Sequence, residues 1–160
     1  MPNWIEGTLK IRGPKENVLR FFEEGIGHCS VNSECPIDEL YKIDQGDEED
    51  SFIYVSIFKI VWVKDTKRAF LEPQDFSIYL DIYSDDQAYA CANVRQAWGF
   101  DTEDWAEISK KYGVDIRLYG IEGGMQFGQI IEFHNGETIL NQGMEFNDYY
   151  WECPFPFMGG

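Results

Sequence analysis

The sequence predicts an α+β domain with a mostly antiparallel sheet, two main helices and extra strands. Three observations lead to this prediction. Several segments alternate apolar and polar residues, two segments repeat at helical spacing, and glycine, proline or asparagine stands between them. The chain has 160 residues, of which 44% are hydrophobic and 16% aromatic. This composition suits one domain with one core and excludes an intrinsically disordered chain.

The first strand and the first helix follow one another directly. Polar and apolar side chains alternate over residues 3–13, a pattern typical of a half-buried strand. Pro14 stops this strand and suits the first turn of a helix, where its missing N–H needs no partner. Residues 15–24 are then expected to form an amphipathic helix that ends at Gly25, with an apolar face made of Val18, Leu19, Phe21 and Phe22.

The middle of the chain combines an irregular segment with strands. Residues 26–50 have no periodicity and are expected to be a loop, with a short helix at 36–41 and a solvated acidic run at 44–50. Residues 52–64 and 76–83 are rich in β-branched and aromatic side chains, which predicts two strands. In the second strand, one face is expected to hold Phe76, Ile78, Leu80 and Ile82.

The next two segments differ in how clearly they can be interpreted. Residues 87–98 suit a helix by their alanines and a strand by their alternation, and we favour the strand. Residues 101–112 predict the second helix, with Thr102 as its cap. Lys110 and Lys111 favour its C-terminal end because cations stabilise the negative end of the helix dipole.

Three strands complete the prediction, at 114–121, 125–134 and 137–142. Asn135-Gly136 is typical of a two-residue hairpin between the last two. Two strand–helix–strand passes around one antiparallel sheet give a ferredoxin-like split βαβ layout. We therefore expect a single ferredoxin-like domain over residues 1–160 with a loop insertion at about 26–50.

The charge of the chain restricts its partners. It carries 29 acidic and 13 basic residues, a net charge of −16. Such a chain is repelled by nucleic acid and by anionic membranes, so we expect it to bind neither directly. The N-terminus shows no secretion signal, and no apolar stretch is long enough to cross a membrane. These features predict a cytoplasmic protein with reduced cysteines.

No pattern in the sequence indicates catalysis. Walker A, GxGxxG, HExxH, GxSxG and CxxC motifs are absent, and neither His28 nor His134 stands in a recognisable catalytic arrangement. Close carboxylate pairs such as Asp85-Asp86 arise by chance among so many acids. We expect no enzymatic activity, no catalytic residues and no cofactor.

The cysteines do not form a zinc motif. His28, Cys29 and Cys35 make a loose cluster that Cys153 might complete in space, but structural zinc sites have paired short spacings. Ordinary small buried residues are the preferred interpretation. We therefore expect no bound metal.

The last quarter of the chain has an unusual composition. Residues 118–160 contain no lysine or arginine, and aromatic residues stand among the acids. Such acids can simply keep the protein soluble, and the aromatic residues can close the core from an edge strand. Alternatively they form a docking surface for a basic protein. The candidate partner-binding residues are Glu145, Asp148, Tyr149, Tyr150, Trp151 and Glu152, followed by Asp47, Glu48, Glu49 and Asp50.

Three segments together resemble a family. The opening Pro2-Asn3-Trp4-Ile5-Glu6-Gly7-Thr8-Leu9, the segment Ala97-Trp98-Gly99-Phe100 and the glycine-rich strand at 123–128 are similar to small phage and plasmid proteins with a YubB-like ferredoxin-like domain. The resemblance leaves about 26–90 uncovered. It implies a ferredoxin-like fold and a mobile-element setting, and it carries no catalytic residues.

These observations give a working hypothesis about function. The chain is expected to be a small acidic phage-type accessory protein that binds and inhibits a basic host protein in the host cytoplasm. A counter-defence inhibitor (anti-CRISPR or anti-restriction) acting as a nucleic-acid mimic belongs to this class. The alternative is a ligand-binding or enzymatic domain that uses an aromatic cleft near Trp98, Trp105 and Trp151.

Overall fold

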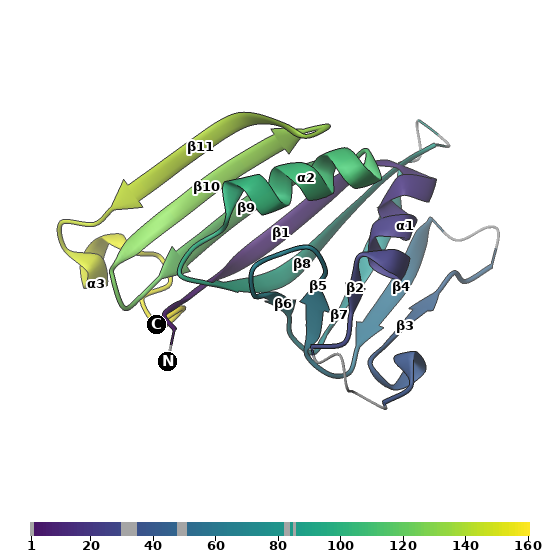
Figure 1. The fold of residues 1–160 in the computed structure, drawn as a ribbon, viewed down its shortest axis with the longest axis horizontal. Coiled ribbons are helices and arrows are strands. Elements are labelled where there is room, and N and C mark those ends of the chain that lie inside the picture. The colour runs from purple at the N-terminus through teal and green to yellow at the C-terminus, as the bar shows by residue number, and fades with distance from the viewer. Residues whose placement is uncertain (1, 30–34, 48–50, 82–83, 85) are drawn as a thin grey trace.

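A single, strongly bent antiparallel sheet dominates the structure, which is a computed structural model (Figure 1). It describes residues 2–29, 35–47, 51–81, 84 and 86–160. Strands account for 49% of the described residues and helices for 19%. The sheet has eleven strands within the described residues, and its main path runs in the order β11-β10-β9-β1-β8-β6-β5-β2.

The strands differ greatly in length. Those at the centre of the sheet are long, and the ones at its far edge have only two or three residues. Their bounds are β1 Trp4–Pro14, β2 Ile26–Gly27, β3 Tyr41–Asp44, β4 Phe52–Ile57, β5 Val61–Val63, β6 Ala69–Leu71, β7 Gln74–Leu80, β8 Gln87–Ala97, β9 Asp115–Glu122, β10 Phe127–His134 and β11 Glu137–Glu145.

The sheet divides at β8. The first part of β8 pairs with β7, with Ala90 opposite Ile78, and its last part pairs with β6, with Gln96 opposite Ala69. β7 continues into β4 and β3, whereas β6 continues into β5 and β2. All of β8 also pairs with β1 on its other edge, so this one strand joins both branches to the centre of the sheet.

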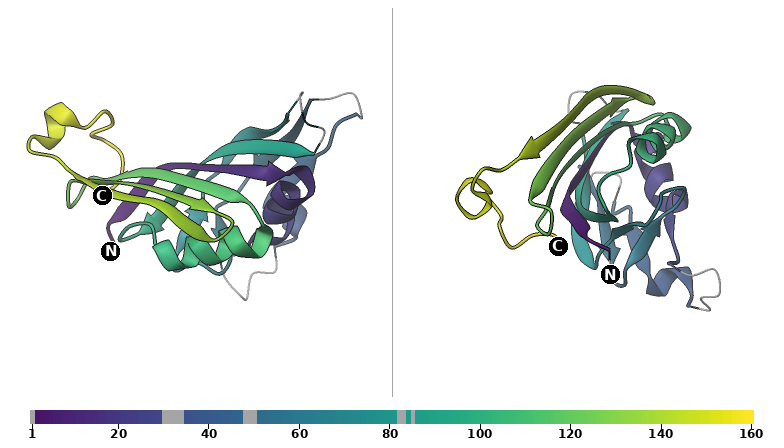
Figure 2. Two further views of the ribbon diagram at one scale, coloured as in Figure 1. Left: turned by 90° about the horizontal axis from the view of Figure 1, so that it is seen from above. Right: turned by 60° about the vertical axis from the view of Figure 1, so that its left-hand side comes forward.

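Two helices cover one face of the sheet and close the main core. α1 (Lys15–Glu24) packs on β1 and β8, and α2 (Thr102–Tyr112) packs on β9, β10 and β11. Figure 2 shows both helices on the same side. The core between them and the sheet includes the fully buried side chains Phe21, Phe22, Trp105, Leu9, Ile11 and Ile116.

The ferredoxin-like prediction is wrong. The structure is mostly sheet and lacks the compact layout with two helices on a small sheet. One predicted crossover exists, because α2 joins β8 to β9 with β1 between them. The other does not, since the chain leaves α1 into β2 at the far end of the sheet order instead of returning beside β1. The strands that lie between α1 and α2 in the sequence explain this difference. β2 to β7 build the two branches beyond β8, which a compact ferredoxin-like sheet does not have.

Several individual elements also differ from expectation. The strand predicted at 52–64 is interrupted at 58–60 and becomes β4 and β5. β6 was not predicted, and the segment expected to be a loop at 26–50 contains the strands β2 and β3. The short helix expected at 36–41 exists as a 3₁₀ turn at Ile37–Glu39. Asp101, not Thr102, caps α2, because its side chain accepts hydrogen bonds from the backbone N–H of Glu103 and Asp104. Ile82, assigned to one strand face, lies outside the described residues.

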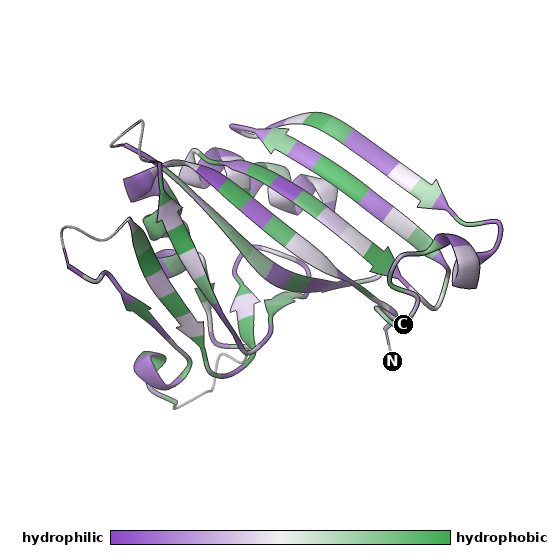
Figure 3. Cartoon of the chain, turned by 180° about the vertical axis from the view of Figure 1, so that it is seen from behind, coloured by the Kyte–Doolittle hydropathy of each residue, from purple (hydrophilic) through white to green (hydrophobic). Residues whose placement is uncertain are grey.

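The opposite face of the sheet is left open. Figure 3 shows the molecule from this side, with hydrophilic and hydrophobic residues alternating along the strands and no long helix in front of them. A third short helix, α3 (Tyr149–Glu152), lies on this side at one end of the sheet (Figure 2). The interpretation of residues 149–151 as part of an edge strand is therefore wrong, because these residues form α3.

Candidate functional site

We call residues 146–160 the C-terminal tail, and its geometry is set by short local hydrogen bonds. The Asp148 carboxylate accepts from the backbone N–H of Trp151 at 3.3 Å, which caps α3. The Glu152 carboxylate accepts in turn from the backbone N–H of Asn147 at 3.1 Å. Both acids thus accept from backbone N–H groups at the N-terminal end of α3, and a single turn of four residues forms where no periodicity predicts one.

One aromatic side chain fastens the tail to the sheet. Tyr149 is 4% exposed and clusters with Ile121 and Cys153 on the open face, separately from the main core. Its ring also meets Phe146 edge to face, with 5.5 Å between ring centroids. Burial raises the pKa of Tyr149 to about 12, and the neighbouring Cys153 contributes to this rise. The tail is therefore held in one place.

Most of the tail's large side chains remain in solvent. Trp151 is 88% exposed and Phe157 is 95% exposed, and Tyr150 projects to a similar degree. Exposed aromatic side chains gathered on one short segment are typical of an interaction site. Of the six residues predicted here, only Tyr149 is buried. Within the described part of the chain, none of the acids Glu145, Asp148 and Glu152 forms an ion pair.

The second predicted acidic segment is remote from the tail. Asp47 is exposed and follows β3, while Glu48, Glu49 and Asp50 lie outside the described residues. β3 and α3 lie at opposite ends of the molecule (Figure 1). The structure therefore does not join Asp47 and the tail into one surface.

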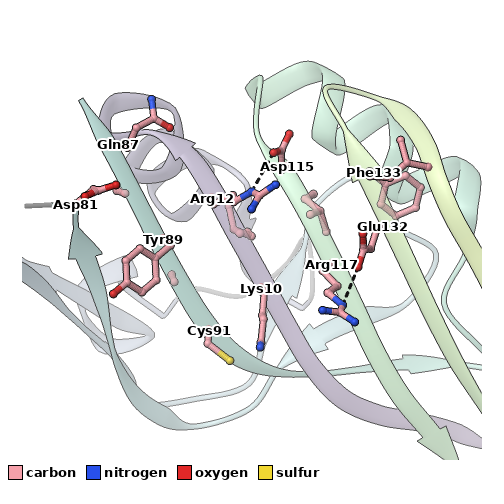
Figure 4. A pocket seen from close by; sticks show the side chains of 15 residues that line it. Lys10, Arg12, Asp81, Gln87, Tyr89, Cys91, Asp115, Arg117, Glu132 and Phe133 are labelled. Carbon is pink, nitrogen blue, oxygen red and sulfur yellow. Dashed lines mark hydrogen bonds and ion pairs between the residues drawn. The ribbon is translucent and has the colours of Figure 1, made fainter. Parts of the chain in front are cut away.

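A hollow of about 850 Å³ opens on the uncovered face of the sheet, where β8, β1, β9 and β10 run side by side (Figure 4). We call it the sheet hollow. The strand register produces a row of outward side chains across it. Lys10 lies opposite Cys91 on one side and opposite Arg117 on the other, and Arg117 lies opposite Glu132. A parallel row places Arg12 between Tyr89 and Asp115.

The charges in the sheet hollow are only partly paired. Arg12 Nε donates to Asp115 at 3.1 Å, and Arg117 Nε lies 2.9 Å from a Glu132 carboxylate oxygen. His134 Nδ1 also lies 2.7 Å from Asp115. Lys10 has no ion-pair partner among the residues that the structure describes. A positive group thus stands free in a strongly acidic protein.

An aromatic shelf adjoins the sheet hollow. Tyr79 and Tyr89 face one another across β7 and β8 with stacked rings, 5.3 Å between centroids and 20° between planes. A second hollow of about 380 Å³ lies over Tyr54, Tyr79 and Tyr89. Tyr89 and Cys91 line both hollows, so the shelf and the basic row meet at β8.

The sequence interpretation missed these residues, although a signal for them exists. Lys10 and Arg12 occupy alternate positions of the first predicted strand, and Asp115 and Arg117 do so in the strand at 114–121. Each pair therefore belongs to one strand face. Which strands are neighbours cannot be read from alternation, and only the register brings the pairs together.

Other proposed sites are not assembled. Trp105 is fully buried and donates its indole N–H to Gln96 at 2.9 Å, so it does not line a cleft with the exposed Trp98 and Trp151. Among the described residues, no group of three or more histidine, cysteine, aspartate or glutamate side chains is placed to hold a metal ion. Cys153 belongs to the Tyr149 cluster, while Cys29 Sγ donates to the carbonyl oxygen of Ile60.

Comparisons with protein-family models, curated proteins and solved structures found no match for this chain. In the part of the chain that the structure describes, no helix has the length and apolar character needed to cross a membrane.

Proposed function

We propose that this chain is a binding protein whose C-terminal tail docks on a basic surface of another protein. The observation that carries the proposal is the exposure of Trp151 and Phe157 on a segment that has no base and whose acids form no ion pair with any residue that the structure describes. Large aromatic side chains supply most of the binding energy at protein interfaces when a partner desolvates them. Leaving two of them in water has no benefit for the fold.

The acids determine the kind of partner. Residues 118–160 contain six acidic residues and no lysine or arginine. Of these, Glu122 is fully buried, Glu132 pairs with Arg117, and Glu137 stands at the far end of β11 from the tail. Glu145, Asp148 and Glu152 remain beside the aromatic groups. Carboxylates around an aromatic patch attract a lysine- or arginine-rich surface and speed its association.

Proteins that bind nucleic acid carry such basic surfaces, and they are the partner class that we propose. On this account the tail carboxylates take the places of phosphates, so that nucleic acid and this protein compete for the partner. An inhibitor of a host defence enzyme in a cytoplasm, of the anti-CRISPR or anti-restriction kind, fits this role. On this account the protein acts on its partner by binding alone.

Affinity capture with matched variants tests the proposal. The tail variant Trp151→Ala/Phe157→Ala removes two exposed aromatic side chains. The control Tyr54→Ala/Phe58→Ala removes two others, one on β4 and one directly after it, at the other end of the molecule. At low salt, wild type and control should retain the same basic protein, and the tail variant should retain about tenfold less or lower. Added nucleic acid should release the retained basic protein from the wild type and from the control. Equal retention by both double variants would exclude the tail as the docking surface. Retention that nucleic acid does not change would exclude the mimicry of nucleic acid.

A further inference from the structure

The placement of Lys10 beside Arg117 does not stabilise the fold. The two residues are directly opposite across β1 and β9, and like charges in that position repel. The chain has 29 acids and only 13 bases, yet the neighbour of Lys10 on the other side is Cys91 and not an acid. An anion seated between the two cations would turn this repulsion into attraction. The Lys10–Arg117 pair therefore favours an anion locally, within a hollow that Asp81, Asp115 and Glu132 also line.

The hydrogen-bond donors in the sheet hollow are also available. Arg12 and Arg117 each use only Nε toward their acidic partners, so that within the described residues both terminal nitrogens of each guanidinium stay without a bond. The Lys10 ammonium adds a third positive group, beside Arg117 (Figure 4). Guanidinium groups with free terminal N–H groups match the geometry of phosphate oxygens. Phosphate is thus the anion that this set of donors fits best.

The aromatic shelf supplies the second half of a ligand site. Tyr89 lies directly opposite Arg12 in the register, and Tyr79 supports its ring from the other side. Stacking of a planar base on an exposed tyrosine is favourable for any of the bases. The sheet hollow, at about 850 Å³, falls within the size range of small-molecule sites.

We propose that the sheet hollow binds a mononucleotide, with its phosphate at Lys10 and Arg117 and its base on Tyr89. A mononucleotide is favoured over a long strand because the net charge of −16 repels a polyanion along its whole length, whereas a single phosphate can sit beside Lys10 and Arg117. The site is separate from the C-terminal tail, since it uses the opposite end of β9 from Ile121. The proposal therefore stands or falls independently of the docking function.

Equilibrium binding of AMP to the full chain at low salt tests this proposal. AMP should bind at least about tenfold more tightly than adenosine or inorganic phosphate, because each of these fills half of the site. Lys10→Gln and Tyr89→Leu should each weaken AMP binding by about five- to tenfold. The matched controls Lys110→Gln and Tyr150→Leu, both exposed and remote from the hollow, should leave it unchanged.

Three outcomes would overturn the proposal. One is AMP binding no tighter than phosphate or adenosine, and another is equal AMP affinity in Lys10→Gln and Lys110→Gln. The third is a short oligothymidylate that binds more than about tenfold tighter than TMP, which would show that the ligand is a strand and not a free nucleotide.

Cys91 gives an independent readout in the unaltered protein. Its exposed side chain lines the sheet hollow beside Lys10, whereas Cys29 is exposed elsewhere. Saturating AMP should slow alkylation of Cys91, measured by peptide mass spectrometry, at least about threefold and leave Cys29 unaffected. Equal alkylation rates of Cys91 with and without AMP would contradict nucleotide binding in this hollow.

Discussion

Tyr149 of α3 packs against Ile121 of β9 on the face of the sheet that the two long helices leave open. This contact buries one aromatic residue of the C-terminal tail and thereby fixes the exposed Trp151 two residues later. A segment held in place before binding loses less conformational entropy when a partner arrives. The buried and exposed aromatic residues of the tail therefore have different tasks, anchoring and contact.

Replacing the anchor should release the tail without unfolding the sheet. Tyr149→Ala removes the main side chain of the small cluster with Ile121 and Cys153, and we expect a loss of about 2 kcal/mol confined to the tail. Chymotrypsin should then cleave the tail faster, while the rest of the chain stays resistant. Tyr150→Ala, which removes an exposed ring, is the control and should be cleaved at the wild-type rate. Equal resistance of the Tyr149 and Tyr150 variants would show that Tyr149 does not hold the tail.

Alkaline pH should loosen the same anchor. Burial raises the pKa of Tyr149 in the folded state to about 12, above the ordinary tyrosine value near 10. The stabilisation tied to the protonated phenol is complete below about pH 10 and is lost as pH rises from there toward about 12. Tyr149→Phe removes the titrating group, so its unfolding free energy should fall less steeply across this interval than that of wild type or Tyr150→Phe. Identical slopes in urea unfolding series would rule out this role.

Gln96 should be important for the attachment of α2. Its side chain is 1% exposed, accepts hydrogen bonds from the Trp105 indole and the Asp101 backbone N–H, and donates to the carbonyl of Lys67. Gln96→Leu keeps the volume but leaves these groups without partners, and we expect a loss of about 3 kcal/mol in the free energy of unfolding. Gln142→Leu, on exposed β11, should change it by less than about 0.5 kcal/mol. A similar small effect for both variants would contradict the assignment.

Gly120 should tolerate no side chain. An added Cβ would lie 2.6 Å from the ring of Phe100 and 2.9 Å from the side chain of Ile5, both of which are buried. Gly120→Ala should therefore cost about 1–3 kcal/mol in thermal or urea unfolding. Gly143→Ala, where a Cβ meets nothing within 4 Å, is the control. Adding Phe100→Leu to Gly120→Ala should restore part of the loss, and a fully additive loss would count against this contact.

The sequence predicts elements well where one periodicity is strong. Helices 15–24 and 101–112 were expected from apolar spacing and exist as α1 and α2. The Asn135-Gly136 hairpin is confirmed as well, because both residues adopt the positive φ that such a turn requires, 46° and 88°. Local signals of this kind need no knowledge of the rest of the fold.

The arrangement of the sheet could not be predicted in the same way. The alternation of residues 87–98 indicates a strand with one buried face, but it does not say that two different strands share one of its edges. Pairing of this kind depends on contacts between residues distant in the chain. The same limit applies to the sheet hollow, whose cations come from different strands, and to Tyr149 and Trp151, whose unequal burial follows from one turn of helix.

The central claim is that the tail acids guide a basic partner to the exposed aromatic residues, and association kinetics test it most directly. The variant Glu145→Gln/Asp148→Asn/Glu152→Gln removes three charges, and asparagine keeps the cap of α3. Against the basic protein that the wild type retains, we predict association about tenfold slower at low salt, a flatter salt dependence and little change in dissociation. Association rates equal to wild type at every salt concentration would contradict the claim.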